Sequence, residues 1–316
     1  MSLIKKTDHF YLIDGSGYIF RAYYALPPLS RKSDGLPTGA VSGFCSMLFK
    51  LLEEARSDES NYKPTHFAVI FDSARKNFRN DIYKEYKANR TEAPEDLVPQ
   101  FEYIRKSVEA FNVTSAEMLN YEADDLIATY TDQILKKGAK VTIVSGDKDL
   151  MQLIGSKELY WDFGRSQPQA KKELESKLEL GCHQMADYLA LVGDASDNIA
   201  GIPGIGDKTA KQLLSHFSDI ESILEHLDQL EGLPIRGARK LADRFAGNQD
   251  QLMLSKRLAT IETDIKDMPD VEQIKWRGVQ EQAFELFAEE MGFGSAFSSR
   301  LADLKKRQLG SGMGIN

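Results

Sequence analysis

Aspartates follow three apolar runs of this 316-residue chain, at the point where each run ends. Asp14 closes "YLID", Asp72 closes "AVIFD", and Asp147 and Asp149 follow "VTIVSG". Such runs predict buried strands of a parallel sheet, and the carboxyl ends of parallel strands meet at one edge, where ligands bind. We therefore expect these four carboxylates to face one pocket.

Five further acids extend this set. Glu122, Asp124 and Asp125 open a predicted helix just before the third run, and Asp194 and Asp197 lie three residues apart in "GDASDN". Any one of them taken alone reads equally well as a helix cap or a turn residue. Nine carboxylates near one point, however, repel each other unless cations compensate them. Hard divalent ions with oxygen ligands are the economical compensation, so the joint pattern predicts a metal pocket.

The elements that must position these acids follow from the apolar pattern. Short apolar runs alternate with amphipathic segments in the first half, which is typical of a parallel sheet flanked by helices. The charged stretch 165–180 is weakly patterned and predicts a connector, and the chain beyond it is helical and punctuated by glycines. The clearest predicted elements are strands over 9–17, 66–74 and 141–144 and helices over 39–55 and 121–138.

These patterns predict two domains. We expect an α/β domain over residues 1–180, a helical domain over 181–300, and a loose tail over 301–316. No apolar run reaches the roughly 18 residues of a membrane span, and the start lacks a secretory signal. Two cysteines make no disulfide framework, so we expect a reduced cytoplasmic protein without a membrane partner.

Charge placement matters more here than the total. The chain carries 40 basic and 48 acidic residues, a net charge of −8, which taken alone argues mildly against a phosphate ligand. Metal ions would mask the nine pocket acids, and without those acids the net charge is about +1. The acidic total therefore does not exclude nucleic acid.

A basic, aromatic segment follows Asp72 directly. Between residues 75 and 90 it carries six basic residues and two acids. Cations beside stacking rings suit a single-stranded nucleic-acid track, although a solvated helix with two core tyrosines is the plainer interpretation of the segment alone. Its position at the mouth of the pocket favours the track, with residues 73–100 forming a mobile arch. The residues at helical spacing along one stripe are Arg79, Tyr83, Tyr86, Lys87 and Arg90.

The stretch "GIPGIGDKTA" (201–210) puts three glycines in a tight turn before a helix predicted to begin near Asp207. Unobstructed amides at a helix start form an anion site. A glycine-rich turn alone is weak evidence, but this order before an apolar helix is the helix-hairpin-helix pattern, which contacts duplex phosphates without reading bases. We expect duplex contacts from Gly201, Gly204, Gly206, Lys208, Thr209 and Lys211.

Taken together, these motifs resemble the 5′-nuclease domain of bacterial DNA polymerase I, within the flap endonuclease superfamily. The resemblance runs in order over about residues 8–300, through "LIDGSGYIFRAYYALPPL", "FDSARKNFRNDIYKEYKANR", "YEADDLIATY", "GDKDLMQL" and "GDASDNIAGIPGIGDKTA". It implies a PIN-like nuclease fold with a helical arch and a helix-three-turn-helix DNA-binding domain. It leaves open whether the chain is a free-standing nuclease or a domain excised from a polymerase.

The resemblance also implies roles for particular residues. Lys87 and Arg90 would engage the scissile phosphate beside Tyr86, and Arg79 would belong to the base of the arch. Ala200 departs from the proline of many relatives but keeps the carbonyl, in a turn that in relatives holds a potassium ion. Unlike some free-standing relatives, this chain retains every metal-site acid. The implied metal ligands are Asp14, Asp72, Glu122, Asp124, Asp125, Asp147, Asp149, Asp194 and Asp197.

The expected activity is a structure-specific 5′-3′ exonuclease and 5′-flap endonuclease of replication and repair. The resemblance implies hydrolysis with two or more Mg²⁺ ions, replaceable by Mn²⁺, with Lys87, Arg90, Asp14, Asp72, Asp124 and Asp147 as the catalytic set. We expect a monomer that binds DNA with 5′ flaps, nicks or 5′ ends and works beside a polymerase. Two rivals stay open: a non-catalytic junction-binding module and a PIN-type ribonuclease.

Overall fold

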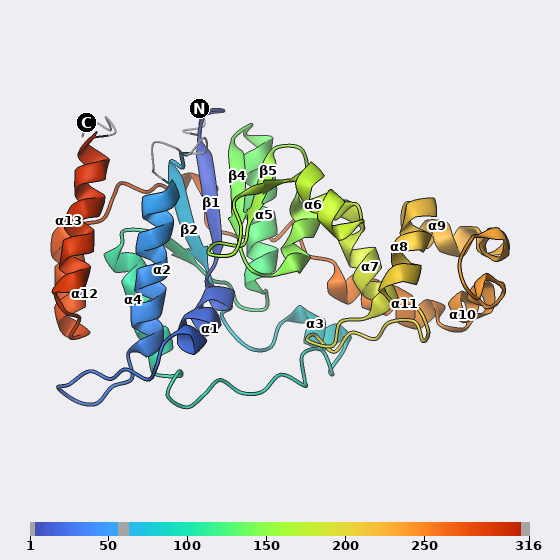
Figure 1. Ribbon diagram of the computed structural model, residues 1–316, viewed down its shortest axis with the longest axis horizontal. Coiled ribbons are helices and arrows are strands. Elements are labelled where there is room, and N and C mark those ends of the chain that lie inside the picture. Colours follow the sequence, from blue (N-terminus) through green and yellow to red (C-terminus); the bar gives the residue numbers. More distant parts are fainter. Residues whose placement is uncertain (1–3, 56–62, 311–316) are drawn as a thin grey trace.

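A six-stranded sheet lies at the centre of the protein (Figure 1). The computed structural model describes residues 4–55 and 63–310. The strands lie in the order β3-β2-β1-β4-β5-β6, and all neighbours are parallel except β5 and β6. The predicted parallel α/β sheet is thereby confirmed. The strands are β1 (His9–Asp14), β2 (His66–Ile70), β3 (Thr114–Ala116), β4 (Lys140–Val144), β5 (Glu158–Trp161) and β6 (Gln169–Ala170).

Helices cover both faces of the sheet, which explains why its central strands read as unbroken apolar runs. In β1, Phe10 and Leu12 belong to one core cluster and Tyr11 and Ile13 to another, because successive side chains point to opposite faces. The helix α5 (Ala123–Lys136) packs on the first face. The opposite face is covered by α1 (Gly15–Ala25), α2 (Gly39–Ala55), α4 (Gln100–Ala110), α12 (Glu281–Glu290) and α13 (Ser295–Gly310).

The second region extends away from the sheet and has its own core (Figure 1). Within the described ranges, no helix is long and apolar enough to cross a membrane. The connector predicted over 165–180 was wrong in part, because α6 forms there. This helix buries only Leu174, so its apolar pattern was too sparse to predict it. The helices are α6 (Lys171–Leu178), α7 (Met185–Val192), α8 (Asp207–His216), α9 (Ile220–Glu225), α10 (Leu241–Gly247) and α11 (Gln249–Ala259).

The predicted arch is mostly not helical. The helix α3 (Phe78–Ile82) has five residues, and residues 83–99 form turns and extended chain until α4 begins. Lys87 even has a left-handed backbone, with φ of +55°. The helical stripe expected from Arg79 to Arg90 was therefore wrong, because contacts with other segments hold these residues in a different geometry.

The chain returns to the sheet after α11, which differs from the predicted helical domain over 181–300. Ile261, Ile265 and Val271 pack in the cluster beneath α5, and α12 and α13 pack against α2. The loose tail predicted from residue 301 is helical to Gly310, and its residues 311–316 lie outside the described ranges. Short 3₁₀ helices complete the fold: η1 (Lys148–Leu153), η2 (Cys182–Gln184), η3 (Leu227–Gly232), η4 (Ala238–Lys240) and η5 (Val271–Gln273).

The returning helices should stabilise the sheet domain measurably. Phe284 of α12 is fully buried, with its ring centroid 5.1 Å from that of Phe49 and 4.9 Å from that of Phe111. We expect Phe284→Ala to lower the free energy of unfolding by about 3–5 kcal/mol in urea denaturation. Leu286→Ala, on the same helix but 61% exposed, is the control and should change stability by no more than about 0.5 kcal/mol. Equal effects would contradict this packing.

Candidate nuclease site

The carboxyl ends of β1 and β2 each present an acid that a backbone amide holds in place. Asp14 caps α1, where its Oδ1 accepts from the Gly17 amide at 3.0 Å and its Oδ2 accepts from the Ser145 hydroxyl at 2.7 Å. Asp72 lies two residues beyond β2, and its Oδ1 accepts from the Ala123 amide at 2.8 Å. Asp72 thus ties the end of β2 to the start of α5.

The end of β4 and the start of α5 bring further acids to the same place. Asp147 caps η1 by accepting from the Asp149 amide at 3.0 Å, so the 3₁₀ turn holds both aspartates at the end of β4. Glu122 and Asp124 lie at the start of α5, where acids complement the helix dipole. Asp147 and Asp149 thus follow a strand end, as the strand-end rule predicts, whereas Glu122 and Asp124 come from a helix start.

These acids feel each other's charge. Burial raises the pKa of Asp14 to about 6, against hydrogen bonds that lower it, and the charges of Asp72 and Asp147 add to the rise. Burial also raises the pKa of Asp124 well above its ordinary value, helped by Asp147 and Asp14. Side chains whose ionised forms destabilise one another in this way form a site prepared for cations.

Asp149 gives the clearest sign of an uncompensated charge. Burial, followed by the charges of Asp147, Asp194 and Asp197, raises the pKa of Asp149 to about 8. Its Oδ1 is buried without a hydrogen-bond partner among the described residues. A buried carboxylate oxygen without a donor is costly, and a bound cation would remove that cost.

Two of the predicted metal ligands already have cationic partners from the segment after α3. Lys87 Nζ contacts Glu122 and lies 3.5 Å from Asp197, and Arg90 binds Asp197 at 2.7 Å. The Tyr86 hydroxyl lies between the two acids, 2.9 Å from Glu122 and 3.0 Å from Asp197. Burial alone would raise the pKa of Asp197, but the charges of Lys87 and Arg90 lower it.

Two predicted roles need correction. Asp125 was predicted as a metal ligand and Arg79 as a DNA contact, but they form a buried pair, with side chains 0% and 2% exposed and atoms 2.7 Å apart. Asp125 also accepts from the amides of Glu122 and Glu262, and Arg79 donates to the carbonyls of Leu258 and Thr260. This pair joins α3, α5 and the end of α11, and neither group is available to a ligand.

The nine predicted acids therefore do not form one uniform cage. In the described part of the chain, no three His, Cys, Asp or Glu side chains converge closely enough to enclose a single ion. Apart from Asp125, they form two linked groups: one paired with cations, Glu122 and Asp197, and one whose charges are not paired in this way. The second group is Asp14, Asp72, Asp124, Asp147, Asp149 and Asp194.

The glycine hairpin lies next in the chain after Asp197. The helix α8 begins at Asp207 as predicted, its first turn has no side-chain cap, and Gly204, Gly206 and Lys208 are exposed before or within it. Lys211 is held by Asp207 at 2.9 Å, so it is less free than the sequence implied. Thr209 is half-buried on the same turn.

The structure requires glycine at two positions of the hairpin. Gly201 was predicted as a duplex contact, but a Cβ there would lie 2.4 Å from the Val192 carbonyl carbon, so this glycine serves close packing against the end of α7. Gly204 has φ of +81°, which favours glycine, and its carbonyl accepts from Arg244 Nη1 at 3.2 Å. Arg244 is a hairpin contact that the sequence did not reveal.

Comparison with known proteins agrees with this geometry. Family models for the 5′-3′ exonuclease N-terminal resolvase-like domain and C-terminal SAM fold match residues 9–179 and 180–282. A 5′-3′ exonuclease of Buchnera aphidicola (Schizaphis graminum) is 34% identical over 260 residues, covering 82% of this chain and 88% of the relative. The chain belongs to the 5′-3′ exonuclease family.

The other relatives fit the same family. DNA polymerase I of Rhizobium leguminosarum is 47% identical over 262 residues, 83% of this chain. The chain spans only 25% to 32% of the length of the polymerase relatives it matches. The fold resembles that of T5 5′-exonuclease with bound zinc, at a TM-score of 0.62, 19% identity and 94% and 98% coverage of the two chains. The fold also resembles that of the Rad2 catalytic core in complex with DNA substrate, at a TM-score of 0.62 and 15% identity, with 95% of each chain covered.

The candidate site also contains two serines that the sequence analysis did not single out. Ser145 is fully buried and donates to Asp14, and Ser16 Oγ accepts from the Asp72 amide at 2.9 Å. The signal for Ser145 was a hydroxyl inside an apolar run, one residue before the glycine that precedes Asp147. Ser16 had no comparable signal, because its partner is 56 residues away.

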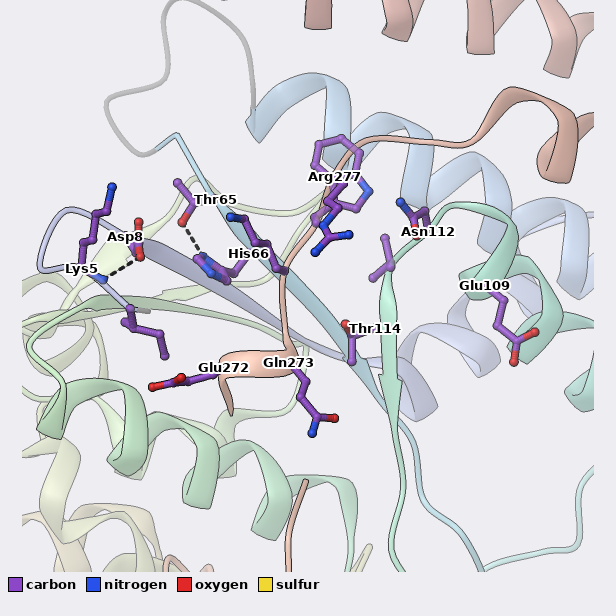
Figure 2. A pocket seen from close by; sticks show the side chains of 14 residues that line it. Lys5, Asp8, Thr65, His66, Glu109, Asn112, Thr114, Glu272, Gln273 and Arg277 are labelled. Atoms are coloured by element: carbon purple, nitrogen blue, oxygen red, sulfur yellow. Dashed lines mark hydrogen bonds between the residues drawn. The ribbon is translucent and has the colours of Figure 1, made fainter. Parts of the chain in front are cut away.

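A polar cavity of about 860 Å³ lies at the opposite end of the sheet, near the amino ends of β1 to β3 (Figure 2). Figure 2 shows Lys5 hydrogen-bonded to Asp8 and Thr65 to His66 on its wall. Its lining mixes both signs of charge and includes none of the site acids, so the family chemistry does not belong to it.

The buried Arg79–Asp125 pair should be structural. Removing one partner strands the other charge in the interior, so we expect Arg79→Met to lower the free energy of unfolding by about 3–5 kcal/mol. Arg75→Met is the control, because the Arg75 side chain is 52% exposed and should tolerate the change. Unchanged stability of Arg79→Met together with weaker DNA binding would restore the role predicted from the sequence.

The uncompensated carboxylate of Asp149 should destabilise the metal-free protein. Because its folded pKa is raised from 3.8 to about 8, the cost appears as pH rises above about 4 and is nearly complete at pH 8. We expect Asp149→Asn to raise Tm in EDTA at pH 8 by about 2 °C or more, and to change it little at pH 4. The exposed Asp228→Asn is the control, and an equal or lower Tm for Asp149→Asn would contradict the assignment.

Proposed function

We propose that this protein is a Mg²⁺-dependent 5′-3′ exonuclease and 5′-flap endonuclease that hydrolyses DNA phosphodiesters near a 5′ end. Family membership supports the nuclease class. The observation that carries the proposal is the set of mutually repelling acids, including the unpartnered Asp149 oxygen, one of which, Asp124, also feels the charge of Lys87. A carboxylate pocket with an adjacent cation is suited to a phosphodiester.

The chemistry of the donor set fits hard divalent ions. Its donors are carboxylate oxygens, which suit Mg²⁺ or Mn²⁺, and the related T5 5′-exonuclease is described with bound zinc. When bound, such ions supply an activated water and stabilise charge on the leaving 3′-oxygen. We assign their binding to Asp14, Asp72, Asp124, Asp147, Asp149 and Asp194, with Glu122 and Asp197 joining once Lys87 and Arg90 turn to the phosphate.

Lys87 and Arg90 would then stabilise the negative charge that develops on the scissile phosphate. Both are held at the site without substrate, since Lys87 is buried against Glu122 and Arg90 is bound to Asp197. Burial alone would lower the pKa of Lys87, but Glu122 and Asp197 raise it, so the ammonium stays charged. The Tyr86 hydroxyl keeps the two acids apart and orients them.

We assign the downstream duplex to the hairpin, where Gly204, Gly206 and Lys208 are exposed. A potassium ion at this turn is also proposed. The carbonyls of Gly204 and Ala200 each accept one hydrogen bond, from Arg244 at 3.2 Å and from Ser255 at 2.7 Å, which leaves each oxygen a second lone pair. Contacts of this kind go to the backbone and carry no sequence preference.

The proposed substrates are DNA with 5′ flaps, nicks or 5′ ends, processed during replication and repair. The Rad2 core described with DNA substrate has the same fold, and the polymerase I relatives support a polymerase as the partner that generates such ends. We further propose that the protein is a monomer and that it lies in the cytoplasm; the two free, buried cysteines support the reducing compartment.

Asp147→Asn tests the proposed chemistry. Asparagine can still cap η1, so we expect binding of a 5′-flap DNA in Ca²⁺ to be retained while the single-turnover cleavage rate in Mg²⁺ falls more than about 100-fold. Asp270→Asn is matched, because Asp270 caps η5 in the same way by accepting from the Glu272 amide at 2.9 Å, and it should cleave normally. Undiminished cleavage by Asp147→Asn would refute the assignment. Faster wild-type cleavage of a matched RNA flap would instead favour a ribonuclease.

A further inference from the structure

Two loops interlock beside the site, the turn over residues 85–90 and the loop over residues 195–198. Asn198 Nδ2 donates to the Glu85 carbonyl at 2.7 Å, and Asn89 Nδ2 donates to the Ala195 carbonyl at 2.6 Å. Between them, the Lys87 amide donates to the Asp197 carbonyl at 3.0 Å. Figure 1 shows the chain after α3 running beside the chain after α7, where these bonds form.

The interlock holds two residues in an unfavourable backbone geometry. Lys87 has φ of +55° and Asn198 has φ of +58°, a region that costs a lysine free energy and that asparagine tolerates better. Backbone of this kind persists only where surrounding contacts determine it. The bonds from Asn198 and Asn89 lie on either side of Lys87, two residues away in each direction, so they set the direction in which its side chain leaves the turn.

We propose that Asn198 and Asn89 are positioning residues for the Lys87 ammonium in the cleavage step. The inference rests on the proposed function, since Lys87 matters only if the site acts on a phosphodiester. The two asparagine amides act through the backbone of residues 85–89 and do not touch the substrate. Lys87 needs this support because its ion pairs with Glu122 and Asp197 would have to give way to the phosphate. A misplacement of about 1 Å can cost 100-fold in rate.

The loop that supplies Asn198 also leads directly into the hairpin. Its ends are closed by two backbone hydrogen bonds between Asp194 and Ile199, at 2.9 and 2.8 Å, and Gly201 follows. Asn198 thus stands between the proposed duplex contact and the turn that carries Lys87. The position of the Lys87 ammonium therefore depends on the helical region that would hold the DNA.

The test compares left-handed asparagines at two places. Asn198→Gly keeps the left-handed backbone accessible and removes only the amide donor. Asn112→Gly is the matched control, because Asn112 also has φ of +55° and donates to a carbonyl, that of Gly278 at 2.9 Å, at the far cavity of Figure 2. We expect Asn198→Gly to slow single-turnover cleavage of a 5′-flap DNA roughly 10- to 100-fold, with flap binding in Ca²⁺ and Mg²⁺ half-saturation unchanged. Asn112→Gly should cleave like wild type.

The second asparagine has its own control. Asn89→Ala should reproduce the loss of rate without loss of binding. Asn248→Ala removes a similar donor, to the Arg244 carbonyl at 2.8 Å, and should leave the cleavage rate unchanged. Equal losses for the variants and their controls would overturn the proposal, as would weaker binding in place of slower cleavage.

A double-mutant cycle decides whether these residues act through Lys87. In a Lys87→Ala background, adding Asn198→Gly should cost about twofold or less, because the group it positions is already gone. The full loss in that background would show that Asn198 acts elsewhere and would overturn the proposal. A wild-type protein that does not cleave would instead refute the proposed function, so the two failures are distinguishable.

Discussion

Repulsion between carboxylates gathered at one edge of the sheet is the constraint on which the rest of this structure depends. Parallel strands end at the same edge, so an acid at each strand end brings charge together whatever the intervening sequence. Backbone amides and a buried serine donate hydrogen bonds to Asp14 and Asp72, but among the described residues no donor reaches one oxygen of Asp149. A folded protein tolerates such a cost where function requires it, and a binding cation removes it.

The protein compensates its other acids in two different ways. Arg79 and Asp125 form a fully buried pair with every carboxylate oxygen bonded, which makes a permanent joint between three segments. Arg90 keeps half of its side chain exposed while it binds Asp197, and Lys87 approaches Glu122 from the turn. Exposure distinguishes Arg90 from Arg79, because a cation that water can reach can also exchange its acid for a phosphate, whereas Lys87, at 13% exposure, is covered more closely by its acids. The same residue types thus serve stability in one place and chemistry in the other.

Packing on the sheet and contacts between the two regions hold the charged site in place. The chain after α11 returns along the sheet, and α12 and α13 fill the layer against α2 with aromatic side chains. The helical region is joined to the sheet domain near the site by Arg79, by the asparagine interlock and by Tyr86, which also packs in the helical core. A rigid frame of this kind is what a site needs when it positions charged groups to within a fraction of an ångström.

The sequence predicted the strands β1, β2 and β4 with their acids, the helices α2 and α5 and the start of α8, because these features depend on local periodicity and on the rule that parallel strands end at one edge. The nuclease family followed from motifs that resemble it, and the strands β3, β5 and β6 were not predicted. Three features became visible only in the folded protein: Arg79 and Asp125 neutralise each other, the turn around Lys87 is not helical, and residues 261–310 return to the sheet. Each of these outcomes depends on partners far apart in the chain, whose burial changes the energy of a charge or a backbone angle. The local sequence pattern does not predict that burial.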